Sequence, residues 1–237
     1  MFRRPCCLLW FLAPLFAAAV LPGAAPLAAQ DDGLEGLTPG SPADAIYGVD
    51  HLGGLPDKAV LVFDYHFGGT LLEQPFDDDV ILDFTRHTED RGFDVAATLF
   101  PGSQNLSIGP LSAAKVNPIL LIFFQRDATQ MSNGTGGSQH YFRNVLRRVL
   151  QTPDPDGRQT VTIEFEGRQV DAREISFQPF VDDPNRARLR AYADKTYSFV
   201  LSEAVPGGIY EVRTETPEEG GGGILLRETY RFREMRQ

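Results

Sequence analysis

Cysteine is nearly absent from this chain, because its only two, Cys6 and Cys7, lie close to the start. The rest of the sequence can therefore form neither an internal disulfide nor a thiolate metal site. The only tryptophan, Trp10, belongs to the same short stretch. A chain of this length can bury a core large enough to fold without cross-links.

Basic residues are also scarce, with 22 Lys and Arg against 32 Asp and Glu and a net charge of −10. Nucleic acid binding needs clustered Lys and Arg to meet the phosphates, so we expect no nucleic acid partner. An acidic surface favours a soluble protein whose copies repel one another.

Long apolar runs are missing except near the start. Arg3 and Arg4 precede an apolar stretch over residues 6–21, small residues run to Ala29, and polar sequence follows. This order predicts a Sec-type signal peptide over residues 1–29. A transmembrane anchor would need ~18 uninterrupted apolar residues, and Pro14 interrupts this run. We therefore expect a periplasmic or secreted mature chain with no transmembrane segment.

The mature part divides into a leader and one domain. Residues 30–57 are rich in Gly, Pro and Asp and predict a flexible leader, with one short helical turn after Ser41. Residues 58–237 predict a single domain. Its strands are indicated by alternating apolar residues over 59–67, 79–87, 93–100, 161–177, 196–202, 209–215 and 224–232.

A helical insert is expected over residues 117–150. Asn117 is a suitable N-cap, and Leu120, Phe124, Ala128 and Met131 then fall on one stripe. A buried strand over residues 119–124 is the alternative, because short apolar runs fit both structures. Ser138 caps a second helix with an apolar stripe that comprises Tyr141, Phe142, Val145, Leu146 and Val149.

Strands, then two helices, then strands predict an α+β domain. We expect a curved antiparallel β-sheet, half-barrel-like or sandwich-like, packed with the two-helix insert. The hairpin about Glu166 and Gly167 is one of its turns.

No common catalytic motif is present, and the best local candidate for chemistry is a set of Asp and His residues. Asp64 and His66 share one face of their expected strand, and Asp83 and His87 share one face of the next, with Asp94 opposite Thr85. Such a face could bind a divalent metal or perform acid–base catalysis. It is also what the solvated side of a half-buried sheet contains, so we expect no metal or cofactor and lean away from an enzyme.

Aromatic residues are plentiful on the apolar faces of the expected strands and helix. They could line a cavity for an apolar ligand or fill an ordinary core. The residues expected to contact such a ligand are Phe63, Tyr65, Phe124, Tyr197, Phe199 and Tyr230.

In outline, this layout resembles the periplasmic half-barrel carriers of lipids and lipoproteins, although it shares no motif with them. The resemblance implies an exported, non-catalytic domain that binds a lipid-like molecule or an envelope partner. A structural or assembly scaffold of the envelope is the alternative, followed by an enzyme or metalloprotein that uses the Asp64/His66/Asp83/His87 face. The sequence leaves the oligomeric state open.

Overall fold

The computed structural model describes residues 36–86 and 92–237. The predicted signal peptide, its cleavage site and His87 lie outside the described residues. Within them, all the strands belong to one nine-stranded antiparallel sheet with the order β4-β3-β2-β1-β9-β8-β7-β6-β5. The strands are β1 (Val60–Gly68), β2 (Phe76–Arg86), β3 (Phe93–Leu99), β4 (Leu106–Ala114), β5 (Arg158–Phe165), β6 (Arg168–Phe177), β7 (Thr196–Leu201), β8 (Ile209–Pro217) and β9 (Ile224–Arg236).

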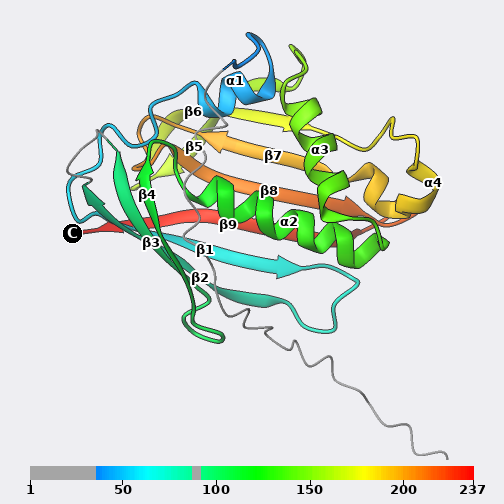
Figure 1. The fold of residues 1–237 in the computed structure, drawn as a ribbon, viewed down its shortest axis with the longest axis horizontal. Coiled ribbons are helices and arrows are strands. Elements are labelled where there is room, and N and C mark those ends of the chain that lie inside the picture. Colours follow the sequence, from blue (N-terminus) through cyan, green and yellow to red (C-terminus); the bar gives the residue numbers. More distant parts are fainter. Residues whose placement is uncertain (1–35, 87–91) are drawn as a thin grey trace, which may run out of the picture.

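The sheet consists of two meanders, β1–β4 and β5–β9, which the β1–β9 pair joins at the centre (Figure 1). It is curved and does not close, so β4 and β5 remain as its two edges. The helices are α1 (Pro42–Tyr47), α2 (Ile119–Thr135), α3 (Gln139–Leu150), α4 (Arg186–Leu189) and the 3-10 turn η1 (Arg190–Asp194). The expected α+β fold with a curved antiparallel sheet and a two-helix insert is confirmed.

The core lies between the concave face of the sheet and helix α2. Phe123 of α2 is fully buried, and its ring lies 5.6 to 6.1 Å from the rings of Tyr197, Phe199 and Tyr230. These three come from β7 and β9, where alternate residues point to the same face of the sheet. One helical side chain therefore packs across β8 against rings from the two strands on either side of it.

The helical insert is confirmed, and its predicted buried stripe is correct except at one aromatic position. The helix begins one residue later than predicted, with Pro118 instead of Asn117 at its N-cap position, and the Asn117 Oδ1 accepts a hydrogen bond from Ile119 N at 3.1 Å. Leu120, Ala128 and Met131 are buried as expected, but Phe123 is the fully buried aromatic and Phe124 is only partly buried. Consecutive helical residues lie about 100° apart, so both can border the same apolar face.

The segment expected to be a flexible leader is packed in the structure from residue 36 onward. It forms α1, whose N-cap Ser41 accepts a hydrogen bond from Asp44 N at 3.2 Å. It also places Ile46, Leu52 and Leu55 in the core. A few apolar residues among many Gly, Pro and Asp are therefore enough to dock this segment on the domain.

Among the strands, β4 is the one that sequence patterns missed. Its residues include Gly109 and Pro110, which interrupt the alternation that identifies the other strands. The predicted hairpins are confirmed: Thr85 lies opposite Asp94, and the β5–β6 turn has Glu166 and Gly167 at positive φ. Two consecutive residues with positive φ match a tight two-residue hairpin turn.

Candidate functional site

A polar centre lies inside the aromatic concave face, beneath α2. Arg126 of α2 donates hydrogen bonds from Nε to the Tyr230 hydroxyl at 3.1 Å and from Nη2 to the Tyr65 hydroxyl at 3.0 Å. Both hydroxyls donate to Oε1 of Glu228 at 2.9 Å. The Arg126 Nε also lies 3.5 Å from that oxygen. Side chains from β1, β9 and α2 thus meet in one network.

The network leaves one strong acceptor unused. The Glu228 side chain is 1% exposed, and its Oε2 has no hydrogen-bond partner among the described residues. An unsatisfied buried acceptor costs about 1–3 kcal/mol, and more for a charged group. Such an atom in a native structure calls for a partner, which a water or a ligand can supply.

Burial and charge set the protonation states of this centre. Burial, and next the adjacent Glu228, raise the pKa of both Tyr65 and Tyr230 far above the usual value, so the hydroxyls stay protonated and act as donors. Burial alone would lower the pKa of Arg126, but contacts with Tyr230, Tyr65 and Glu228 raise it overall. Arg126 therefore keeps its positive charge.

Arg126 connects this centre to the surface. Its guanidinium carbon lies 4.7 Å from the centre of the Phe100 ring and 5.3 Å from that of Tyr65, and its side chain is 29% exposed. Cation–π contacts of this kind hold the guanidinium in place without neutralising it. The centre thus combines a partly accessible cation with a buried acceptor, surrounded by aromatic rings.

A second buried polar cluster forms around Asp127, the residue that follows Arg126 in α2. Asp127 accepts hydrogen bonds from Lys195 Nζ and, at 2.7 Å, from the Tyr197 hydroxyl. The Asp127 and Lys195 side chains are at most 4% exposed. Consecutive residues of α2 thus bind opposite parts of the sheet: Arg126 reaches β1 and β9, and Asp127 reaches β7 and the residue before it. Sequence patterns gave no sign of this pair, which lies 68 residues apart in the chain.

The six aromatic residues predicted to contact a ligand all lie between the concave face and α2. Five of them are less than 2% exposed, and only Phe124 is partly buried. They pack on one another and on neighbouring rings, as in the Tyr65–Tyr230 contact at 4.9 Å and the Phe124–Phe199 contact at 5.8 Å. In this conformation the rings are packed together, and their role in binding stays a prediction.

The structure does not gather the predicted Asp and His residues into one site. Asp64 accepts a hydrogen bond from Arg233 at 2.7 Å, while His66 Nδ1 lies 2.6 Å from Asp77. Asp83 is exposed and lies beside Val60, near the other end of β1. Within residues 36–86 and 92–237, no three His, Cys, Asp or Glu side chains are placed to hold a metal ion together.

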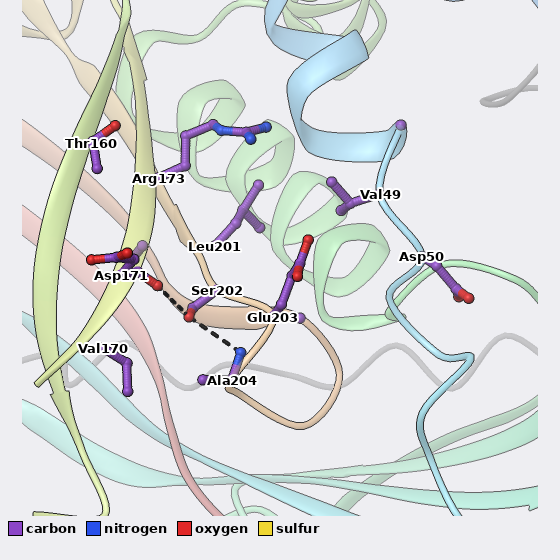
Figure 2. Close-up of a pocket in the computed structure, with 13 residues that line it drawn as sticks. Val49, Asp50, Thr160, Val170, Asp171, Arg173, Leu201, Ser202, Glu203 and Ala204 are labelled. Atoms are coloured by element: carbon purple, nitrogen blue, oxygen red, sulfur yellow. Dashed lines mark hydrogen bonds between the residues drawn. The ribbon is translucent and has the colours of Figure 1, made fainter. Parts of the chain in front are cut away.

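An open cleft of about 750 Å³ lies between the end of α1 and the β5–β7 part of the sheet (Figure 2). Thr160, Arg173 and Leu201 face it from three adjacent strands and are in register with one another. Leu201 also belongs to the hydrophobic core, so the cleft borders the concave interior. The sequence analysis did not identify this cleft, because its walls come from segments far apart in the chain.

The cleft wall is mixed in character. Ser202 donates a hydrogen bond to the Asp171 carbonyl at 2.6 Å, which fixes the β7–β8 connection against β6 (Figure 2). The side chains of Asp171, Arg173 and Glu203 form no hydrogen bond or ion pair with the described part of the chain. None of the six predicted aromatic residues lines this cleft.

None of the described helices is both long enough and apolar enough to cross a membrane.

Comparison with known proteins adds little. No protein-family model matches the chain, and no curated protein matches it. One similar solved structure is described as "Lipid-protein interactions in lipovitellin", with a TM-score of 0.21 and 10% sequence identity. The match covers 76% of this chain and 26% of that chain. At that TM-score the likeness supports no inference about function.

Proposed function

We propose that this chain is an exported, non-catalytic protein that binds a lipid-like amphiphile between α2 and the concave face of the sheet. The apolar part of the ligand would lie on the aromatic side chains of β1, β7 and β9. Its polar end would meet Arg126 and Glu228. The observation that carries this proposal is the buried, unpartnered Oε2 of Glu228 beside a partly exposed arginine.

The charge of this centre indicates the kind of polar group that fits. Arg126 and Glu228 form an ion pair at 3.5 Å, so their charges offset one another. A neutral head group that both donates and accepts, such as a hydroxyl or an amide, can bond to Glu228 Oε2 without adding an unpaired charge. A free carboxylate would instead meet Glu228 as a like charge.

Entry of such a ligand requires α2 to move away from the sheet, because Phe123 occupies the centre of the concave face. Gly136 and Gly137 follow α2, and Gly136 has a φ of +74°, which glycine adopts without strain. The connection to α3 can therefore absorb a change in the angle of α2. The signal-like N-terminal sequence and the missing catalytic motifs support export and a binding role.

Native mass spectrometry of the chain purified from the cell envelope tests this function. We expect a bound species that denaturation and solvent extraction release as a lipid. We also expect a fluorescent monoacylglycerol to bind more tightly than the fatty acid of the same chain length. Arg126→Gln should weaken monoacylglycerol binding, whereas Arg147→Gln on the exposed side of α3 should not.

Circular dichroism and thermal melting of both variants establish that each has folded. A folded wild-type chain that carries no lipid and binds neither probe contradicts the proposal. If that lipid-free chain captures an envelope protein instead, the alternative of a scaffold or assembly role gains support.

A further inference from the structure

The two edges of the sheet differ in how well they resist pairing with another strand. Edge strand β4 contains Pro110, which has no N–H to donate, and its register with β3 shifts at two places. Ala113 also has a φ of +53° there. Proline and irregular backbone are two of the devices that prevent strand addition at an edge. The β4 edge is therefore protected.

Edge strand β5 carries none of these devices. Its eight residues include no Pro, Gly or Lys, and it pairs with β6 in an unbroken register from Arg158 to Phe165. Thr160, Val161, Thr162 and Ile163 form a β-branched run that is exposed or half-exposed. Among the described residues, the side of β5 away from β6 has no neighbouring strand. Regular, open edges of this length are templates for another strand.

We propose that β5 pairs antiparallel with β5 of a second copy of this chain, about a two-fold axis at Val161. In that register Arg158 lies opposite Glu164 of the second copy, and Thr160 lies opposite Thr162. Because the axis repeats each contact, one interface contains two Arg–Glu pairs and two Thr–Thr pairs. Opposite-charge and Thr–Thr pairs are both favourable between antiparallel strands.

The charges on β5 favour a second copy as the occupant. Glu164 is exposed and forms no ion pair with the described part of the chain. Arg158 donates to the Ser41 carbonyl and lies 3.9 Å from Asp44, but its side chain is still 26% exposed. Each copy thus offers an unpaired carboxylate at the point where the other copy offers a partly exposed arginine.

The pairing joins two nine-stranded sheets through their β5 edges and leaves the concave faces and α2 free. It is independent of the proposed ligand. An eight-residue strand pair is small beside the roughly 1,200–2,000 Å² buried in stable interfaces. We therefore expect a reversible dimer that forms as the protein concentration rises.

Analytical ultracentrifugation over a wide concentration range tests the pairing. The wild-type chain should shift from monomer to dimer. Glu164→Lys places a like charge opposite Arg158 twice per dimer and should weaken association by roughly tenfold. Val161→Lys puts two lysines together on the axis and should leave the chain monomeric.

Two matched controls separate this interface from general effects of charge. Glu73→Lys makes the same charge change as Glu164→Lys in the exposed β1–β2 loop, and Ser112→Lys adds a lysine to β4; both should dimerise like the wild type. A chain that stays monomeric at every concentration overturns the proposal. A dimer whose association is unchanged by the β5 substitutions also overturns it, and so does a different polypeptide found paired with β5.

Discussion

The two faces of the sheet are built from the same strands, yet the ion pairs around Arg233 on one face and those of α2 on the other differ in how far they are buried. On the convex face, Arg233 donates to Asp64 at 2.7 Å and to Asp79 at 2.8 Å, and all three side chains are at least 30% exposed. On the concave face, Arg126 and Asp127 reach into aromatic surroundings and meet partners that are almost completely buried. Exposed pairs contribute about 0–1 kcal/mol each, whereas breaking a buried pair is costly.

Strand β9 shows this separation of buried and exposed side chains within a few residues. Tyr230 and Phe232 are buried on the concave side, while Arg231 and Arg233 are exposed on the convex side. Alternation along the strand explains that separation. Glu228 is the exception, because it carries a carboxyl group onto the concave side and needs Arg126 and two tyrosines there. The comparison predicts that stability depends mainly on the concave face.

The largest effect should come from Phe123→Ala at the centre of the concave face. Removing a fully buried ring that contacts four others should lower the free energy of unfolding by about 4 kcal/mol. Phe124→Ala should cost clearly less, because that ring is only partly buried. Chemical denaturation measures both, and equal losses would show that α2 is rotated relative to the structure.

Next in size is Asp127→Ala, which leaves Lys195 buried without its carboxylate. We expect a loss of about 3 kcal/mol, at the lower end of the range for broken buried pairs. Asp64→Ala on the convex face should cost at most about 1 kcal/mol. If the two variants unfold at the same denaturant concentration, the two faces do not differ as we describe.

A smaller effect should appear only in acid and depends on His51, which is buried at the rim of the concave side. Burial lowers its pKa from the ordinary 6.5, although the hydrogen bond to the Ile46 carbonyl, the nearby Gly207 backbone and the charge of Asp50 oppose that shift. A lowered folded-state pKa means that the unfolded chain binds the proton more readily. This contribution to stability is therefore present above pH 6.5 and is lost as the pH falls below it.

His51→Gln should flatten the decline in stability between about pH 7 and 5, the range in which histidine titrates. His140→Gln on the exposed side of α3 is the control and should leave the decline unchanged. Denaturation at several pH values measures both. An unaltered decline in His51→Gln would show that this histidine does not cause the loss of stability in acid.

The smallest effect is expected for Arg233→Gln on the convex face. Losing its bonds to Asp64 and Asp79 should cost about 0.5 kcal/mol in dilute buffer and less in high salt, because exposed charges are screened. Urea denaturation at two salt concentrations measures the change. A loss of several kcal/mol that salt does not reduce would place this network with the buried ones.

Sequence patterns anticipated most strands, both long helices and the curved-sheet class, because alternation and capping are local signals. They placed Phe124 in the helical stripe and missed that Phe123 is the buried ring, since neighbouring positions both border the apolar face. They also placed no residue of 36–57 in the core. The many Gly, Pro and Asp residues indicated a flexible segment, although Ile46 and Leu52 are buried there.

The polar centres could not be found in this way. Arg126 and Asp127 look like ordinary solvated residues of an amphipathic helix. Their partners Glu228 and Lys195 are far away in the sequence, and no local spacing links the members of either cluster. Only the tertiary arrangement, with α2 seated across β7, β9 and β1, brings them together.

The pairing of β1 with β9 has a consequence for how the protein is made. Val60 lies opposite Arg236, so the central strand of the sheet meets one of its neighbours only after the intervening chain has been synthesised. Contacts between such distant segments slow folding, because a long loop has to close first. During synthesis β1 can pair with β2 on one side while its other side stays open. The first meander is thus an incomplete sheet with an exposed inner strand until the second meander arrives.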